Sequence, residues 1–367
     1  MHESLKLETQ KLIQSWDRHE ASHLENYLVA QVEDPRINVQ SIFSRHFLLD
    51  ELFPNRFARL QHEEYRFAAV MNWLAGPGVS SQDPEFHPAV RHALRLGADN
   101  AEGFPIPAFL RRAFQELPVD ADGVLVPNYL EDFFDSPRSS LTDPAGPVLD
   151  LFQNLWSRRL GSEAIPRSQR LSVLEAACGS ANDYRFLEAY KLAPLLDYCG
   201  FDLSAKNIGN ARARFPGARF CEGNVFEIDA ADQAYDLCFV HDLLEHLSPA
   251  GLEKAVGELG RVSRRGLCVG FFQMHERAEH TIRPVEDYFW NTLSMDRMRE
   301  LFFQHGFQSQ VIHIQSFLRN QFGCEYTHNP DAYTMILRRE NTDALQQPAG
   351  GRSSKEGFGT ADSGPLA

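Results

Sequence analysis

The second half of the chain alternates short apolar runs with amphipathic stretches, and this alternation constrains the fold more than any other feature. Between two of the runs, Ile208, Ala211 and Phe215 share one helical face, and the stretch after 248 repeats that spacing. Short strands that alternate with helices are typical of a parallel sheet with crossover helices. We therefore predict an α/β fold with strands at residues 171–177, 195–202, 218–224, 235–242 and 266–272.

Signals at the ends of the expected elements support this interpretation. Ser204 and Ser248 precede two of the helices and are typical N-caps, and Pro249 suits a first helical position. After a helix that ends at His305-Gly306, residues 307–318 and 332–339 alternate apolar and polar side chains. Such alternation is typical of half-buried strands, so we predict that these two runs pair as antiparallel edge strands.

The first half of the chain has a different character. From Leu5 to about Leu160 its apolar residues recur at helical spacing, with breaks where Pro and Gly gather. The last break, at residues 136–147, is typical of a linker between domains. We predict a mostly α-helical N-terminal domain at residues 1–145 and an α/β domain at residues 146–340. Residues 341–367 are rich in Gly, Ser, Ala and Pro, and we expect a disordered tail there.

Composition narrows the possible partners. The 367 residues carry a formal net charge of -14, which argues against nucleic acid, since its binding depends on Lys and Arg that neutralise phosphates. No stretch is apolar enough to act as a signal peptide or to span a bilayer, so we expect a cytoplasmic protein with no membrane partner. The six cysteines lack the spacing of zinc sites or disulfide frameworks and are expected to be reduced. The oligomeric state stays open.

The chemistry of the chain is concentrated where the first expected strands end. Residues 175–181, with the sequence EAACGSA, are acidic and then small, so the backbone can approach a ligand just before a helix begins. Asp202 ends the second strand, where a carboxylate can accept hydrogen bonds from both hydroxyls of a ribose. A cap or a surface turn is the structural alternative for Asp202. Together the two features predict a ligand that contains a nucleoside.

Five segments, in order, resemble the motifs of class I S-adenosylmethionine-dependent methyltransferases: VLEAACGSAND, GFDLSAKNIGNAR, EGNVFEI, YDLCFVHDLLEHLSPAGLEKAVGELGRV and RRGLCVGFF. The resemblance covers about residues 153–340 and implies a Rossmann-like seven-stranded sheet with S-adenosyl-L-methionine as the cofactor. It also implies a methyl transfer to an acceptor, which we expect to be a small molecule. The cofactor residues that it implies, or that lie beside them, are Glu175, Ala177, Cys178, Gly179, Ala181, Asp202, Leu203, Asn224, Val225 and His241.

The chain departs from the family pattern at three of these positions. Ala177 and Ala181 stand where the family commonly has glycine, which suggests a wider or differently bent loop. Asn224 replaces an acid, although its amide oxygen can still accept a hydrogen bond from adenine. These departures leave open a catalytically silent binding module, and a protein methyltransferase is a further alternative. A nicotinamide-dependent oxidoreductase is disfavoured because the G-x-G-x-x-G spacing is missing.

A base is needed if the acceptor atom is a hydroxyl or a protonated amine, and His is the usual candidate near neutral pH. We predict His241, after the fourth strand, and His280, after the fifth, as catalytic residues. The structural alternative is that both lie in solvated loops. The aromatic residues 288–291 either wall an acceptor pocket or pack against the first-half helices. No cluster of carboxylates suggests magnesium, and we predict that no metal is bound.

Overall fold

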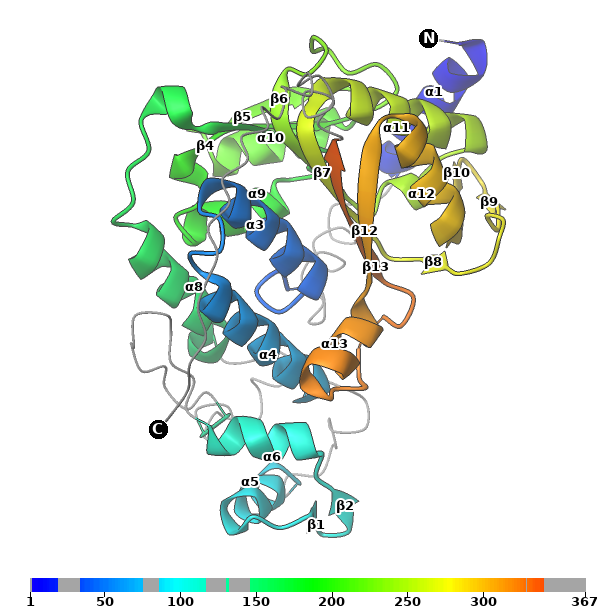
Figure 1. Cartoon of the computed structure of the whole chain (residues 1–367). Helices are drawn as coiled ribbons and strands as arrows, with labels where there is room; N and C mark the ends of the chain where they lie inside the picture. The colour runs from blue at the N-terminus through cyan, green and yellow to red at the C-terminus, as the bar shows by residue number, and fades with distance from the viewer. Residues whose placement is uncertain are drawn as a thin grey trace, which may run out of the picture.

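The computed structural model describes residues 2–18, 34–74, 86–116, 130–131, 146–327 and 329–339. Its centre is a seven-stranded sheet with the strand order β12-β13-β7-β6-β3-β4-β5 (Figure 1). Neighbouring strands are parallel except at β13, which is antiparallel to both β12 and β7. The strands are β3 (Leu171–Ala176), β4 (Leu196–Asp202), β5 (Arg219–Glu222), β6 (Tyr235–His241), β7 (Ser263–Phe271), β12 (Phe307–His313) and β13 (Tyr333–Arg339).

The order of the strands reverses at β3, which pairs with β4 on one side and with β6 on the other. In open parallel sheets of this kind, ligands bind outside the carboxyl ends of the strands at the point of reversal. Residues 177–181, Asp202 and His241 all lie at that edge. The Rossmann-like α/β fold predicted from the sequence is therefore confirmed.

The crossover helices begin at the predicted caps. Ser204 accepts a hydrogen bond from the backbone N–H of Asn207, and Ser248 accepts one from the N–H of Gly251. Pro249 occupies the first turn, where its missing N–H costs nothing. The helices are α9 (Asn182–Ala189), α10 (Ala205–Arg214), α11 (Pro249–Val262) and α12 (Met295–Gln304).

Both faces of the sheet are buried, because successive residues of its strands contribute to two different cores. Leu237 and Phe239 of β6 belong to one core, and Cys238 and Val240 belong to the other. The first core includes side chains of α9, α10 and the N-terminal helices, while the second includes those of α11 and α12. Because both faces are buried, the sequences of these strands are continuous apolar runs.

The N-terminal half is helical, as predicted, apart from a small hairpin of β1 (Asn100–Ala101) and β2 (Phe104–Pro105). Figure 1 shows α5, α6 and the hairpin at the lower end of the molecule, away from the large sheet. The helices are α1 (Glu3–Arg18), α3 (Val39–Leu52), α4 (Ala58–Leu74), α5 (Phe86–Leu96), α6 (Ala108–Gln115) and, after the expected linker, α8 (Gly146–Leu160).

The helical half and the sheet share one core. Gln40 of α3 reaches the sheet and donates hydrogen bonds to the carbonyl oxygens of Phe271 and Tyr333, each at 2.9 Å. Phe67 of α4 and Trp156 of α8 are fully buried in the same core as Phe239. The division into domains at residue 145 stays a prediction, and the packing joins its two parts tightly.

The C-terminal elements differ in part from the expectation. Residues 307–313 form β12, but residues 314–322 form a helix, α13 (Ile314–Phe322), where a strand was predicted. The helix ends at Gly323, whose φ of 75° suits a left-handed C-cap. The pairing of β12 and β13 is antiparallel as predicted, although only β12 lies at the edge. The expected linker at 136–147 and the tail at 341–367 lie largely or wholly outside the described residues.

Three further observations hold for the part of the chain that the structure describes. None of its helices combines the length and the apolar character needed to cross a membrane. It contains no group of three or more His, Cys, Asp or Glu side chains arranged to hold a metal ion. All six cysteines are free thiols, and Cys221 alone among them is exposed.

Candidate active site

Three of the five residues in the loop after β3, residues 177–181, have a left-handed backbone conformation. Ala177, Gly179 and Ala181 have φ angles of 53°, 52° and 68°. The loop is fastened by the N–H of Cys178, which donates to Phe201 at 2.9 Å, and by the N–H of Ala181, which donates to the Cys178 carbonyl oxygen at 3.0 Å. Both alanines thus adopt the conformation that glycine favours, at a cost of about 1–2 kcal/mol each. A methyl group at these positions does not prevent the turns.

Asp202 connects this loop with the end of β4. Its Oδ2 accepts a hydrogen bond from the N–H of Gly179 at 3.0 Å, and its Oδ1 accepts from the Ser204 N–H at 2.8 Å and from the Asn207 amide at 3.2 Å. Burial raises the pKa of this carboxyl, and the three hydrogen bonds oppose that rise. Because a carboxylate offers about four acceptor positions, Asp202 is held rigidly while one position stays available. Its role in ribose binding stays a prediction.

Glu175 lies deeper than its neighbours and is bound to the adjacent strand. The Tyr198 hydroxyl donates to its Oε2 at 2.5 Å. Burial, reinforced by Asp183, raises the pKa of Glu175 well above its usual range. Burial also raises the pKa of the Cys178 thiol. The Glu175 side chain thus joins β3 to β4, while the Cys178 thiol donates to the Gly179 carbonyl oxygen within the loop. Their contribution to cofactor binding stays a prediction.

Helix α1 is brought to the end of β5, although more than 200 residues separate the two in the sequence. Asn224 donates from its amide nitrogen to the Thr9 hydroxyl at 3.0 Å, while its amide oxygen accepts from the Phe226 N–H at 2.9 Å. Val225 is buried in the same core as Leu5. The sequence analysis missed this contact: Leu5, Glu8, Thr9 and Leu12 recur at the spacing of one helical face, but that spacing does not reveal what the face contacts.

Glu8 fastens the same helix to α11. Its two carboxylate oxygens accept hydrogen bonds from the backbone N–H and the hydroxyl of Ser248, at 2.7 and 2.5 Å. Ser248 in turn caps α11. Figure 1 shows α1 beside α11 at the upper right of the molecule. Helix α1 therefore lies beside Asn224 and Val225, where the adenine of a cofactor is expected.

His241, at the end of β6, is held from two sides. Its Nδ1 lies 3.0 Å from Oδ2 of Asp183 in α9, and its Nε2 lies 2.5 Å from the Ser44 hydroxyl of α3. Burial lowers the pKa of His241, but the ion pair with Asp183 outweighs it, so the pKa lies well above its usual range. Ser44 donates onward to the Gln40 carbonyl oxygen at 3.2 Å. A doubly protonated imidazole cannot accept a proton, and this geometry favours a structural role over the predicted role of base.

His280, the second predicted base, lies in the loop that follows β8 (Met274–His275). Its Nδ1 accepts a hydrogen bond from the backbone N–H of Ser294 at 2.9 Å. Burial lowers the pKa of His280, which keeps the ring neutral with its other nitrogen protonated. The Nδ1 atom, which could accept a proton, is thus already occupied by the hydrogen bond from Ser294. His280 and His241 share no hydrogen-bond partner, so the hydrogen bonds do not join the two predicted bases.

Asp242, one residue after His241, is an exposed carboxyl at this edge that the sequence analysis did not predict as catalytic. Its side chain is exposed, and its backbone has a φ of 50°, which is uncommon for a residue other than glycine and is typical of functional sites. Surrounding protein nevertheless desolvates the carboxyl and, with Asp183, raises its pKa to about 6 against the opposing charge of His241.

Glu245 follows Asp242 by one turn and is fully buried. Its Oε1 accepts from the backbone N–H groups of Phe272 and Gln273, at 2.8 and 3.3 Å, beyond the end of β7. Its Oε2 has no hydrogen-bond partner among the described residues. Burial, reinforced by Asp242, raises the pKa of Glu245 to about 8. At neutral pH the two neighbouring carboxyls therefore carry one charge, on Asp242.

Four rings gather at the far end of the same turn and form what we call the aromatic face: His246, Phe272, Tyr288 and Trp290. The ring of His246 lies 5.3 Å from that of Phe272, 5.8 Å from Tyr288 and 5.3 Å from Trp290, measured between centroids. Phe272 and Trp290 are 5.1 Å apart. Of the two alternatives for residues 288–291, packing against a first-half helix agrees with the structure, because β10 (Tyr288–Phe289) contacts α1. Their role as the wall of an acceptor pocket stays a prediction.

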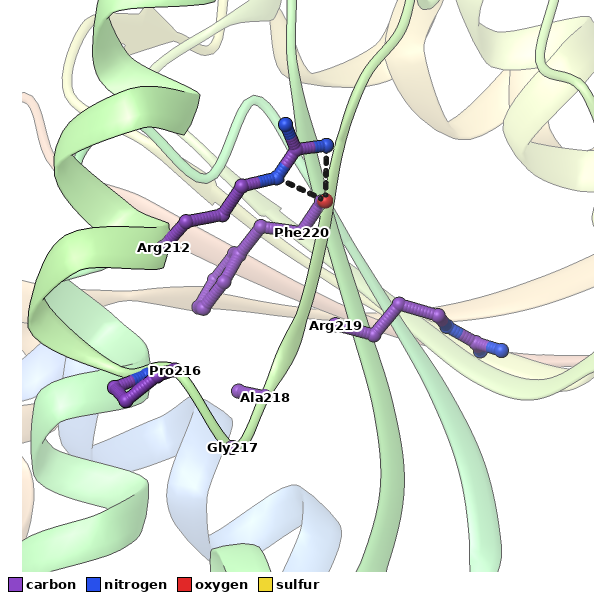
Figure 2. Close-up of a pocket in the computed structure, with 6 residues that line it drawn as sticks. All are labelled: Arg212, Pro216, Gly217, Ala218, Arg219 and Phe220. Carbon is purple, nitrogen blue, oxygen red and sulfur yellow. Dashed lines mark hydrogen bonds between the residues drawn. The ribbon is translucent and has the colours of Figure 1, made fainter.

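A surface depression elsewhere in the sheet does not belong to this site. It lies where β5 begins, at the opposite end from Asp202, and is open to solvent (Figure 2). Figure 2 shows that the Arg212 guanidinium is bound to the Phe220 carbonyl oxygen, at 3.1 and 2.8 Å, while Arg219 points away. Its lining residues are Arg212, Pro216, Gly217, Ala218, Arg219 and Phe220.

Comparison with known proteins agrees with the site that the structure forms. Residues 173–266 match the family model of a methyltransferase domain. Over 107 residues the chain is 29% identical to a malonyl-[acyl-carrier protein] O-methyltransferase of Pectobacterium atrosepticum. That alignment covers 29% of this chain and 40% of the relative, so the chain spans less than half the length of the curated relative. The matched segment, residues 173–266, is therefore similar to a methyltransferase domain, in agreement with the resemblance of the five motifs.

Solved structures that resemble the chain include two methyltransferases. A 1,6-didemethyltoxoflavin-N1-methyltransferase of Burkholderia thailandensis, solved with S-adenosylhomocysteine, is 15% identical with a TM-score of 0.36, over 66% of this chain and 94% of its own. An S-adenosylmethionine-dependent methyltransferase of Mesorhizobium loti is also 15% identical, with a TM-score of 0.35, over 50% of this chain and 95% of its own.

Proposed function

We propose that this protein transfers a methyl group from S-adenosyl-L-methionine to a small-molecule acceptor. The observation that carries the proposal is the joining of loop 177–181 to Asp202 by the Gly179 hydrogen bond, at the point where the strand order reverses. That junction lies within the segment that matches a methyltransferase domain. No side chain of the loop needs to move for its backbone to face a ligand, because the left-handed turns are already formed.

The contacts of the site suggest how the methyl donor is held. The free acceptor position on Asp202 would bind the ribose, and the N-terminus of α9 would lie beside the amino-acid end of the donor. Adenine would pack between Leu203 and Val225. Its amino group would share the Asn224 amide oxygen with the Phe226 N–H, since a carbonyl oxygen can accept two hydrogen bonds.

The reaction needs mainly orientation, because the sulfonium is activated already and its leaving thioether is neutral. Holding donor and acceptor in line can supply much of the rate, and exclusion of water adds to it. His241 contributes by fixing α3 and α9 against the end of β6, which shapes the edge where the two substrates meet.

A small organic acceptor is favoured over nucleic acid by the net charge of -14. An acceptor held on a carrier protein is a second candidate, favoured by the name of the curated relative. The silent binding module suggested by the loop alanines loses its main argument, since both alanines form the turns.

The proposal is tested by the products of turnover. Purified protein is first examined by mass spectrometry for S-adenosylmethionine or S-adenosylhomocysteine retained through purification. The protein is then incubated with S-adenosylmethionine and panels of amines, alcohols, carboxylic acids and acyl carrier proteins, and release of S-adenosylhomocysteine is measured. Release that depends on a small acceptor supports the proposal, whereas release with carrier-bound acceptors alone contradicts it. Failure to bind either nucleoside would overturn it entirely.

A further inference from the structure

We infer that the methyl acceptor is an amine on an aromatic or apolar body, with its nitrogen held between Asp242 and the aromatic face. The inference rests on the proposed function and names the substrate class of the same site. It depends on three observations: the position of Asp242 on the turn that leads to the aromatic rings, the distribution of charge around that turn, and the accessibility of its carboxyl.

The first observation concerns a single short turn. Residues 242–246 carry Asp242 at the beginning and His246 at the end, with the 3-10 helix η4 (Leu244–His246) between them. Glu245 fastens this turn to the backbone of Phe272, and the Phe272 ring packs on His246. The His246 Nδ1 donates a hydrogen bond to the Phe289 carbonyl oxygen at 3.1 Å, which fixes the ring. Asp242 and the aromatic face are therefore carried by one short turn that is fixed to the end of β7.

The second observation is that this unit carries a net negative charge. His241 is positive, but its charge is matched by Asp183 at 3.0 Å. His246 is neutral at pH 7, because burial lowers its pKa. Glu245 is neutral because burial and Asp242 raise its pKa to about 8. Asp242 is left as the ionised group, with a pKa of about 6, and among the described residues His241 supplies the positive charge that acts on it.

The third observation is that the recognising groups can be reached. Asp242 is exposed, and Phe272, Tyr288 and Trp290 each keep part of their surface accessible. Aromatic faces attract cations through their quadrupole, and Trp does so most strongly. A carboxylate beside such rings is therefore suited to a protonated nitrogen. A carboxylate acceptor would instead meet the like charge of Asp242, which disfavours binding.

The chemistry follows from this placement. The amine arrives protonated, and Asp242 takes one proton from its nitrogen. The freed lone pair attacks the methyl carbon of the sulfonium, so that the N–C bond forms while the S–C bond breaks and its electron pair stays on sulfur. The products are the methylated ammonium ion and neutral S-adenosylhomocysteine, and the proton on Asp242 passes to water. Removal of a proton by a carboxylate positioned in this way is ordinary general base catalysis.

The test compares three matched probes: phenethylamine, phenethyl alcohol and 3-phenylpropionate. Binding of each to the full-length protein saturated with S-adenosylhomocysteine is measured by titration calorimetry and by Trp fluorescence. The amine is expected to bind roughly tenfold or more tightly than the other two, in line with a cation–π contact joined to a charge pair. Methylation of the amine with release of S-adenosylhomocysteine is expected as well.

Variants assign the preference to the named groups. Asp242→Asn should remove the preference for the amine while S-adenosylhomocysteine still binds, because Asn tolerates the same left-handed backbone. Trp290→Leu should weaken the amine more than the alcohol. Glu276→Gln, which removes an exposed carboxylate just after β8, should change neither.

The inference is overturned if the alcohol or the carboxylate binds as tightly as the amine, if no probe binds at millimolar concentration, or if Asp242→Asn keeps the preference. In those cases binding of S-adenosylhomocysteine leaves the proposed function standing. If the wild-type protein fails to bind S-adenosylhomocysteine, the proposed function and the acceptor assignment fail together.

Discussion

His241 shows how a residue at a catalytic edge can be used for structure. Histidine is the usual base near neutral pH, and a strand end in this fold is where such a base is expected. The sequence could not reveal that Ser44 and Asp183, from two distant helices, lie against both ring nitrogens. Asp242, one residue later, keeps the accessible surface and the raised pKa that a base requires. The contacts in space therefore favour Asp242 over His241 as a base, and both catalytic roles stay predictions.

The charge on His241 makes stability depend on pH. Its pKa in the folded protein lies well above that of an unfolded histidine, so the stabilisation is complete below about pH 6.5 and is lost as pH rises through the folded value. We expect His241→Asn to lower the free energy of unfolding at pH 6 by about 3–5 kcal/mol, the usual cost of breaking a buried ion pair. Denaturant unfolding at pH 6 and pH 9 should show a smaller loss at the higher pH. An equal loss at both would mean that His241 is neutral.

The left-handed alanines give a second expectation. Ala177→Gly should raise the free energy of unfolding by about 0.5–1 kcal/mol, because relief of the strained φ outweighs the greater freedom of glycine in the unfolded chain. Affinity for S-adenosylmethionine should be unchanged or slightly higher. Ala176→Gly, one residue earlier inside β3, is the control and should destabilise. Thermal melts of the two variants compare them, and destabilisation by Ala177→Gly would show that the methyl group is needed for packing.

At the scale of elements, sequence signals predicted correctly those helix ends that depend only on neighbouring residues. Ser204, Ser248 and Pro249 define helix starts through contacts within three residues, and all three act as predicted. The runs at 307–318 misled because His313 and the residues after it continue an apolar pattern that a helix can also satisfy. Helix α1 was missed as a part of the site because its contacts with Asn224 and Ser248 are purely long-range.

The contact of α1 with the cap of α11 can be measured directly. Glu8→Ala removes the acceptor of two hydrogen bonds from Ser248, and we expect a loss of about 1–3 kcal/mol in the free energy of unfolding. Because α1 lies beside Asn224, affinity for S-adenosylmethionine should fall as well. Glu3→Ala, at the exposed start of the same helix, is the matched control. Equal stability of the two variants would place α1 away from α11.

For the whole molecule, the sequence indicated two parts, and the packing unites them. Val173, Leu237 and Phe239 cover one sheet face and are buried beneath α3, α4 and α8 together with the crossover helices. A boundary near residue 145 marks a change in sequence pattern, and periodicity cannot reveal that both sides of it contribute to one core. The parallel pairing of β3 to β7, by contrast, was predicted from the alternation of apolar runs and helices.

A truncated chain tests this unity. Residues 146–367 expressed alone would expose the apolar sheet face that α3 and α4 cover in the whole protein. We expect this fragment to aggregate or to unfold without a cooperative transition, as measured by calorimetry and circular dichroism. A soluble fragment with a sharp transition close to that of the full chain would show that the α/β part is an independent domain.

The central claim is that Asp202 and the loop beside it hold the nucleoside of S-adenosylmethionine. Titration calorimetry of the wild-type protein, of Asp202→Ala and of Asp197→Ala, which removes an exposed carboxylate from the same strand, tests it most directly. We expect binding by the wild type and by Asp197→Ala, and a loss of about 1–3 kcal/mol in binding free energy for Asp202→Ala. Equal affinity of all three proteins, or no heat from the wild type at millimolar cofactor, would contradict the account.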